Sequence, residues 1–253
     1  ADSIFEQPTE FEMVTAIAFA WFARRQCDIV VCEVGMGGEF DATNVIGAPE
    51  AAVLCNIGLD HTEVLGDTLE KIAATKSGII KPGCDAVLYR STDGVEAVVE
   101  QRCREVGAAL HKVDFTQLHL RQHSLEGQVF DFGGRENLHL PLLGEHQLHN
   151  AAVALTTLDV LQKRSWNITE EDIRQGLSHV MWPGRFQIIR RDPLFLIDGG
   201  HNPQCIQALA QNIADYLPNR PLTVLTGVLS DKDYHCMYRS VANHAVEFIT
   251  VTP

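Results

Sequence analysis

Apolar and polar positions follow two different periods along the chain, which predicts a mixed α/β fold. A helix is predicted from Phe11 to about Arg25, and Thr9 and Glu12 have the spacing of a capping box at its start. Residues 28–34 form a nearly unbroken run rich in β-branched side chains. Such a run is typical of a strand that is buried on both faces of a parallel sheet.

The same alternation continues through the first half of the chain. Strands are predicted at 51–57 and 86–89, and helices from Asp67, with Glu70 at capping distance, to about residue 81, and at 95–106. Strand and helix in regular alternation indicate a parallel sheet with right-handed crossovers.

The second half changes character twice. The alternating segment 128–132 before Gly133-Gly134 predicts an antiparallel hairpin. Helices then follow at 147–162 and 169–180, and Trp182-Pro183-Gly184 breaks the pattern. We therefore predict one domain over residues 1–183 and a second over 184–253. The second is predicted from strands at 194–197, 222–226 and 247–251 and helices at 203–216 and 234–242.

Composition narrows the classes of function. Lys and Arg number 20 against 33 Asp and Glu, a net charge of −13, which disfavours non-specific nucleic-acid binding. No apolar run reaches the roughly 18 residues of a membrane span. The seven cysteines include no C-x-x-C pair, which indicates free thiols in a reducing cytoplasm.

Polar residues at two predicted strand ends indicate chemistry, because ligands of open α/β sheets bind at the carboxyl ends of strands. Glu33 precedes the glycine-rich segment 35–38, and Asp60-His61 follows the next strand. Glu33 is either a carboxylate that caps a neighbouring helix or a metal ligand or general base. Glu33 and His61 together would be an incomplete shell for Mg²⁺, which nucleotide phosphates could complete.

Lys76 falls on the apolar stripe of its helix, with Leu69, Ile72 and Ala73 at helical spacing. It either extends to solvent or is a buried lysine with a perturbed or modified amine.

Asp198-Gly199-Gly200-His201-Asn202-Pro203 follows a predicted strand and opens a helix. This segment is either a turn with a helix cap or a set of functional groups at a strand end. Asp231-Lys232-Asp233 after the next strand is equally a solvated turn or a site.

Taken together, these motifs resemble folylpolyglutamate synthases, some of which are also dihydrofolate synthases, within the Mur ligase superfamily. The resemblance runs in order along the chain, through residues 33–44, 56–62, 76–79, 144–152, 183–186 and 198–203. It implies an α/β fold in which a Mur-ligase-like central nucleotide-binding domain is followed by a Rossmann-like C-terminal domain. It also implies a cytoplasmic enzyme, monomeric at full length, that meets neither nucleic acid nor membrane.

The activity that this resemblance implies is an ATP-dependent ligation of L-glutamate to the γ-carboxylate of a reduced folate through an acyl phosphate. Mg²⁺ and ATP are the implied cofactors, with Glu33 and His61 as metal ligands. The remaining roles are catalysis by Lys76 (in carbamylated form), Asp41 and His201; nucleotide binding by Asn150, Arg185, Asp198 and His201; and glutamate binding by Asp231, Lys232 and Asp233.

The main departure from the family is that no G-x-x-x-x-G-K-[ST] sequence occurs within these residues. Such a phosphate-binding loop precedes the matching segment in the family, so both domains are expected to be incomplete, the first at its start and the second at its end. We therefore expect little or no turnover by the 253 residues alone. An inactive ligase-derived fragment and a cell-wall Mur ligase relative are the alternatives.

Overall fold

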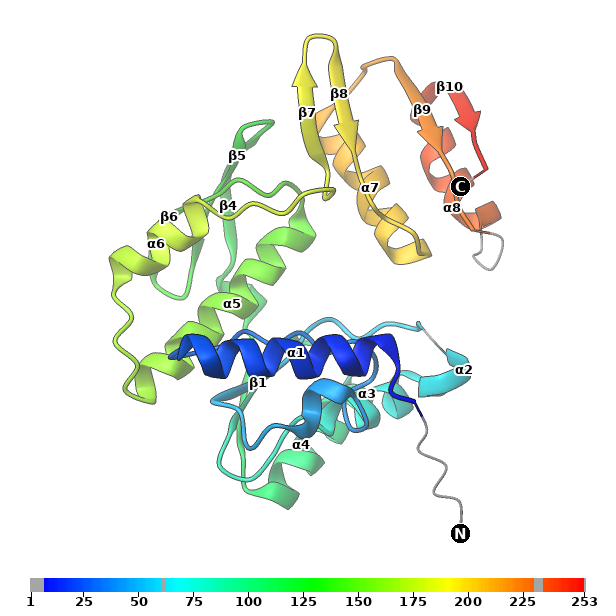
Figure 1. Cartoon of the computed structure of the whole chain (residues 1–253). Coiled ribbons are helices and arrows are strands. Elements are labelled where there is room, and N and C mark those ends of the chain that lie inside the picture. The colour runs from blue at the N-terminus through cyan, green and yellow to red at the C-terminus, as the bar shows by residue number, and fades with distance from the viewer. Residues whose placement is uncertain (1–6, 61, 230–233, 253) are drawn as a thin grey trace. The chain divides into compact units, whose positions relative to one another are not determined.

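The computed structural model describes residues 7–60, 62–229 and 234–252 (Figure 1). Its contacts divide the chain into two units, each with its own apolar core. The first unit comprises Ala1–Val113 and Thr156–Trp166, and the second comprises Asp114–Leu155 and Asn167–Pro253. The predicted domain division at residue 183 stays a prediction. None of the described helices is long and apolar enough to cross a membrane.

A parallel sheet of three strands organises the first unit. Its strands are β1 (Ala51–Leu54), β2 (Asp85–Leu88) and β3 (Ala109–Lys112), in that order. The prediction of a parallel sheet is confirmed, but β3 was missed. Its side chains are partly exposed and mixed in polarity, so it lacks the apolar run of an inner strand.

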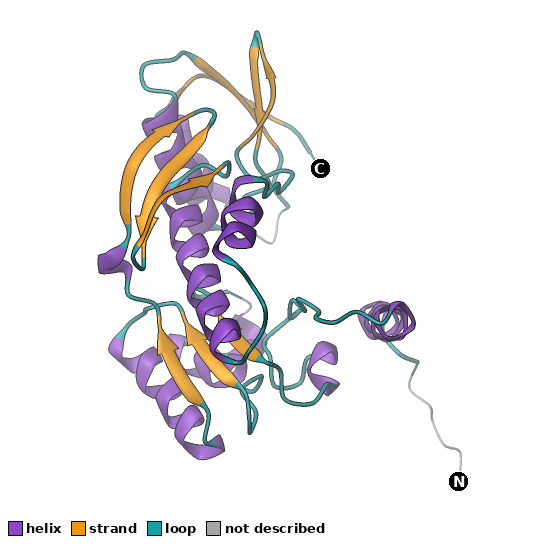
Figure 2. Ribbon diagram, turned by 90° about the vertical axis from the view of Figure 1, so that its left-hand side faces the viewer, coloured by secondary structure: helices purple, strands orange, loops and turns teal. Residues whose placement is uncertain are grey.

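Two helices, α3 (Leu69–Ser77) and α4 (Asp93–Val106), pack against this sheet and against each other (Figure 2). Ile72 of α3 and Val95 and Val99 of α4 are fully buried. They meet Leu54 and Leu88, which point to the same face of the sheet. The helical stripe and the alternation in the strands therefore build one core.

The start of α3 differs by one residue from the prediction. Thr68, and not Asp67, is the N-cap, and its hydroxyl accepts a hydrogen bond from the Lys71 N–H at 3.3 Å. Asp67 instead pairs with the Lys71 ammonium at 2.7 Å. A short helix, α2 (Thr62–Leu65), precedes this turn.

The first helix of the chain, α1 (Glu10–Arg25), forms as predicted, with a complete capping box between Thr9 and Glu12. The predicted strand at 28–34 does not form, and that prediction is wrong. This segment pairs with no described strand, and Val31 is 98% exposed. An apolar run can become an inner strand only where neighbours satisfy its backbone groups on both sides.

An antiparallel meander opens the second unit. It consists of β4 (His119–Ser124), β5 (Gly127–Phe132) and β6 (Arg135–Leu140), and Gly133-Gly134 forms the predicted turn. The short helix η2 (Phe115–Gln117) precedes it, and α6 (Glu170–Ser178) packs on β6. The long helix α5 (Glu145–Lys163) begins in this unit, soon after the meander.

The C-terminal segment of the same unit contains two pairs of strands. An antiparallel hairpin joins β7 (Gln187–Arg191), which was not predicted, to β8 (Leu194–Ile197), and β9 (Leu222–Thr226) pairs in parallel with β10 (Ala245–Thr250). The helices α7 (Pro203–Tyr216) and α8 (Tyr234–Ala242) begin and end at the predicted residues. Their buried faces form a core that also includes Leu143 and Phe186.

Candidate active site

The glycine-rich loop of the first unit lies directly against the end of α3. A Cβ atom on Gly38 would lie 2.8 Å from the Lys76 carbonyl oxygen and 2.9 Å from that of Thr75. The Glu39 N–H donates to the same Thr75 oxygen at 3.0 Å. Gly38 is therefore required for a close approach of the loop to the helix. Gly37 likewise lies close to α3, since a Cβ atom there would be 3.0 Å from the Thr75 side chain.

Side chains also hold this loop to the end of α3. The Asn44 Nδ2 group donates to the carbonyl oxygens of Glu39 at 3.1 Å and Gly78 at 3.3 Å. The Lys81 ammonium donates to the Asn44 carbonyl at 2.7 Å. The structure thus brings together the motifs at 37–44 and 76–79, which lie far apart in the sequence.

Asp41 organises the loop through both carboxylate oxygens. Its Oδ1 accepts from the Thr43 N–H at 2.9 Å and the Thr43 hydroxyl at 2.6 Å, and its Oδ2 accepts from the Met36 N–H at 2.8 Å. Desolvation raises the pKa of Asp41, but the hydrogen bonds from Thr43, Met36 and Gly35 outweigh it and hold the pKa below its ordinary value. Asp41 is thus an ionised acceptor at neutral pH and also caps the short helix η1 (Ala42–Val45).

Glu33 and Lys76 both lie within electrostatic range of Cys55, which follows β1. Desolvation and the Glu33 carboxylate raise the pKa of the Cys55 thiol, and the Lys76 ammonium opposes them. Glu33 is exposed and Lys76 is half-buried. The structure therefore places an acid and an amine near the end of β1, where the sequence predicted a site.

The predicted sharing of one Mg²⁺ ion by Glu33 and His61 stays a prediction, because His61 lies outside the described residues. In the described ranges, no group of three or more His, Cys, Asp or Glu side chains could hold a metal ion. The role of Glu33 as a Mg²⁺ ligand therefore stays a prediction. A single carboxylate is compatible with Mg²⁺, which usually keeps waters and binds phosphate oxygens.

In the second unit, Asp198 joins two loops. Its Oδ2 accepts from the Phe186 N–H at 2.8 Å, and its Oδ1 accepts from the Gly200 N–H at 2.7 Å. The Gly199 N–H also donates to the Gly184 carbonyl at 2.7 Å. The exposed Arg185 is thereby fixed beside the loop that follows β8, with its guanidinium near Gly199.

His146, at the start of α5, was not among the predicted site residues. Desolvation lowers its pKa below the ordinary value; the Asp198 carboxylate opposes that effect, while His149 and the Arg185 guanidinium reinforce it. His146 is therefore neutral at pH 7 and lies within electrostatic range of two predicted nucleotide ligands. Its sequence signals were its place at a helix start, two residues after Gly144, and within the motif 144–152.

Two further predicted residues, Asn150 and His201, lie on α5 and on the loop that follows β8. Asn150 is exposed one helical turn beyond His146, and its Nδ2 donates to the Gln147 Oε1 at 3.3 Å. His201 is exposed, with its Nδ1 atom 3.2 Å from the Gly199 carbonyl oxygen. Asn202 caps α7 by accepting from the Cys205 N–H at 2.9 Å, so a helix cap is present in this motif.

Three predicted residues of this unit have no described position. Asp231, Lys232 and Asp233 lie outside the part of the chain that the structure describes. Their assignment to glutamate binding therefore remains a prediction.

Two family profiles match the chain in sequence order. The Mur ligase middle domain matches residues 6–158, and the Mur ligase glutamate ligase domain matches residues 184–253. The chain belongs to the Mur ligase family. Its α/β fold, with the two Mur ligase domains in this order, is as predicted.

Within that family, the chain is similar to folylpolyglutamate synthases. It is 39% identical to the Lacticaseibacillus casei folylpolyglutamate synthase over 236 residues, which are 90% of this chain and 54% of that protein. The solved FPGS–AMPPCP–folate complex superposes with a TM-score of 0.88 at 37% identity, covering 97% of this chain and 61% of that one. For the Mycobacterium tuberculosis enzyme complexed with ADP, the TM-score is 0.83 at 33% identity, with 97% and 56% covered. The chain thus spans little more than half the length of these relatives.

Proposed function

We propose that this chain carries the nucleotide-handling residues of an ATP-dependent ligase that adds L-glutamate to the γ-carboxylate of a reduced folate. The observation that carries the proposal is the grouping of Arg185, Asp198 and His146 in a chain similar to folylpolyglutamate synthases. One solved relative holds an ATP analogue with folate, and another holds ADP.

In the proposed nucleotide site, each side chain has a distinct task. The exposed Arg185 offers a planar fork of N–H donors to a phosphate. Asp198 fixes the loop beside Arg185 and offers its remaining acceptor capacity to ribose hydroxyls. Asn150 presents both an amide donor and an acceptor, as the edge of adenine requires. His201 approaches the nucleotide from the loop after β8.

In the proposed phosphate and metal region, Glu33 and His61 would hold Mg²⁺, which supplies positive charge against the phosphates when bound. Lys76 would be carbamylated at its amine, which exchanges a cation for a carboxylate within electrostatic range of Cys55. Asp41 holds the glycine-rich loop that follows Glu33 in place, because its carboxylate accepts from the Met36 and Thr43 N–H groups.

The proposed reaction transfers the γ-phosphoryl group of ATP to the folate carboxylate and leaves ADP and an acyl phosphate. The amine of glutamate then attacks the acyl carbon, an amide bond forms, and inorganic phosphate leaves with the proton passing to solvent or to a nearby base. Asp231, Lys232 and Asp233 would bind the incoming glutamate. The proposed setting is the cytoplasm and the proposed full-length state is a monomer.

The nucleotide site is tested by titrating the 253-residue chain with ADP and Mg²⁺. Arg185→Ala should weaken ADP binding by about tenfold or more, because a charge-assisted hydrogen bond contributes about 1.5–3 kcal/mol. The control is Arg190→Ala, which removes an exposed guanidinium from β7, whose Nε donates to the Pro193 carbonyl. Equal affinities for the two variants would contradict the assignment.

The ligase reaction is tested by phosphate release and product mass with tetrahydrofolate, glutamate and ATP. We expect no measurable turnover by these residues alone and turnover by a longer protein that adds a G-x-x-x-x-G-K-[ST] loop. Turnover by the 253 residues alone would show that the loop is not required. A longer protein that ligates no glutamate to folate would contradict the proposed activity.

A further inference from the structure

The loop before α5 is held on one side by a buried glutamine of the meander. Gln128 of β5 is only 2% exposed. Its Nε2 donates to the Leu142 carbonyl at 2.7 Å and to the Gly144 carbonyl at 3.1 Å. Both N–H groups of the buried Gln128 amide therefore donate to backbone carbonyls of the loop before α5.

On its other side, α7 holds the same loop through Tyr216. The Gly144 N–H donates to the Tyr216 phenol oxygen at 3.1 Å. Gly144 has φ +105°, and a Cβ atom there would collide with the side-chain amide of Asn212, which is 2% exposed. Only glycine fits this position, both for its backbone conformation and for the close approach of α7.

Gly144 determines where α5 begins. Its carbonyl oxygen accepts from the Gln147 N–H at 3.0 Å and from the Leu148 N–H at 3.4 Å, the first bonds of the helix. His146 lies in that first turn and Asn150 lies one turn later. Any group that fixes Gly144 therefore fixes the direction in which these two side chains leave the helix.

Tyr216 also contacts the region of the proposed phosphate ligand. Its ring lies 5.9 Å, centroid to centroid, from that of Phe186, the residue after Arg185. It meets the His123 ring of β4 edge to face at 5.1 Å. Tyr216 therefore contacts the loop before α5, the strand β4 and the loop that carries Arg185.

We propose that Tyr216 is a positioning residue for the nucleotide site, which holds the first turn of α5 in register with Arg185 through its hydrogen bond to Gly144. The proposal rests on the proposed function, because it takes Asn150 and Arg185 as the nucleotide ligands. In this role Tyr216 acts through Gly144 and not through contact with the nucleotide. Its hydroxyl accepts the Gly144 N–H, which would otherwise lose its partner in a buried loop.

The test compares two phenol deletions in the ¹⁵N-labelled chain. Tyr216→Phe removes the acceptor and keeps the ring contacts. Tyr238→Phe is the matched control, because it removes a hydroxyl from α8, where the ring meets Phe248 at 5.3 Å. Each variant is measured for hydrogen exchange of the Gly144 amide and for ADP binding in the presence of Mg²⁺, well below its melting temperature.

We expect Tyr216→Phe to speed exchange at Gly144 by about tenfold and to raise the dissociation constant of ADP by about fivefold, which corresponds to about 1 kcal/mol. Tyr238→Phe should change both by less than about twofold. Unchanged ADP affinity in Tyr216→Phe would overturn the proposal, whether or not exchange is faster. If the unsubstituted chain binds no ADP, the proposed function fails, and the exchange rate alone decides whether Tyr216 holds α5.

Discussion

Two mainly apolar stretches of the first unit differ in how deeply their side chains are buried. The strand β2 and the segment 28–34 both begin with aspartate and are otherwise mainly apolar. In β2, Ala86, Val87 and Leu88 are fully buried between β1 and β3. In the segment 28–34, Ile29 is 46% exposed and Val31 is 98% exposed. The difference lies in hydrogen-bonded neighbours and in helices that cover the faces, not in the side chains themselves.

This comparison shows why apolar content alone does not determine burial. A buried strand must satisfy every backbone N–H and C=O, and only adjacent strands supply enough partners in an apolar interior. The helix α1 repeats the lesson, because its capping box is complete while Val14, Ile17 and Trp21 remain exposed. Local sequence signals are enough for such a helix to form. Most of its stability, however, has to come from packing against other elements.

The largest expected effect comes from truncating the core of the covered sheet. Ile72→Ala should lower the free energy of unfolding by about 2–5 kcal/mol, because Ile72 is fully buried and its loss leaves a cavity. The matched control Ile29→Ala in the uncovered segment should change it by less than about 0.5 kcal/mol. Urea unfolding measures both. Equal losses would mean that the segment 28–34 is packed in solution.

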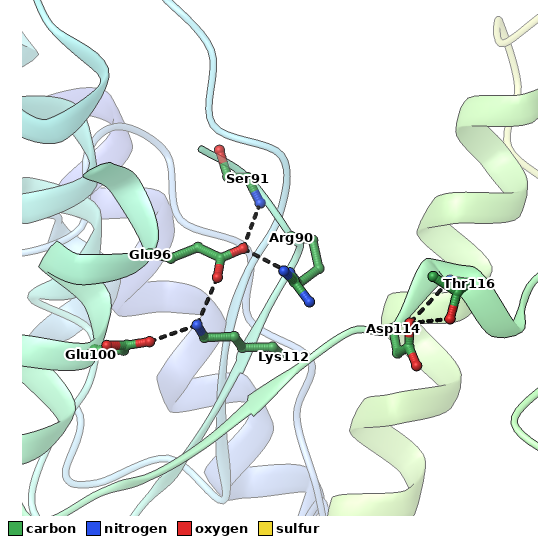
Figure 3. Close-up of polar contacts among 7 residues, drawn as sticks. All are labelled: Arg90, Ser91, Glu96, Glu100, Lys112, Asp114 and Thr116. Atoms are coloured by element: carbon green, nitrogen blue, oxygen red, sulfur yellow. Dashed lines mark hydrogen bonds and ion pairs between the residues drawn. The ribbon is translucent and has the colours of Figure 1, made fainter. Parts of the chain in front are cut away.

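Next in size is the loss of a buried charge at the end of the sheet (Figure 3). Glu96 is 5% exposed, and its carboxylate accepts from the Arg90 Nε at 2.8 Å, the Ser91 N–H at 3.2 Å and the Lys112 ammonium at 2.7 Å. Glu96→Gln should cost about 1.5–3 kcal/mol, because charge-assisted hydrogen bonds are lost.

The control for this substitution is Glu105→Gln on the same helix, which removes an exposed carboxylate that accepts from the Gln101 side-chain amide at 3.0 Å. It should leave the midpoint of urea unfolding nearly unchanged. A midpoint for Glu96→Gln that matches this control would show that the network around Glu96 contributes nothing net to folding.

The same network predicts a pH dependence. Desolvation raises the pKa of Glu96, but Lys112, Ser91 and Arg90 outweigh it and hold the pKa below its ordinary value of 4.5. Because the pKa is lower in the folded state, the stabilisation is fully present above about pH 4.5 and is lost as pH falls through the folded pKa. Unfolding curves between pH 6 and pH 3 should show a shallower decline for Glu96→Gln. If the stability of Glu96→Gln declined with falling pH as steeply as that of the unsubstituted chain, other carboxylates would be responsible for the acid sensitivity.

The smallest expected effect concerns α1. Thr9→Ala removes the hydroxyl that accepts the Glu12 N–H, and such a cap contributes about 1 kcal/mol to its helix. Because α1 packs weakly, we expect faster hydrogen exchange in its first turn and little change in global unfolding. Thr169→Ala is the comparison, because the capping box of Thr169 starts α6, which packs on β6. A larger global loss for Thr9→Ala than for Thr169→Ala would show that α1 is well packed.

Much of the secondary structure was predictable because its causes are local. The capping boxes at Thr9 and Thr169, Asn202 before Pro203, and the turn at Gly133-Gly134 are each decided by a few adjacent residues. Errors occurred where strand pairing, and not the apolar pattern, decides the structure. The strands β3 and β7 were missed, because their pairing with β2 and β8 compensates for a weak apolar pattern.

In the candidate site, too, the sequence indicated some residues, while the contacts that explain them depend on distant segments. Gly38 and Asp198 stood out in the sequence, but the reason for each is a contact with a distant segment, α3 for Gly38 and the Phe186 N–H for Asp198. His146 was missed, since only the fold brings it within range of Asp198 and Arg185. Burial and electrostatic range depend on three-dimensional neighbours, which no spacing along a helix reveals.

The sequence by itself determined the α/β class, most helix boundaries and the order of the family's motifs, because periodicity, caps and turns act over a few residues. Only the tertiary structure decided that residues 28–34 stay unpaired, that glycines of the loop admit α3, and that Tyr216 reaches Gly144. The physical reason is that hydrogen-bond partners, desolvation and close backbone approach arise between segments far apart in the chain. Their free energies exist only once those segments meet.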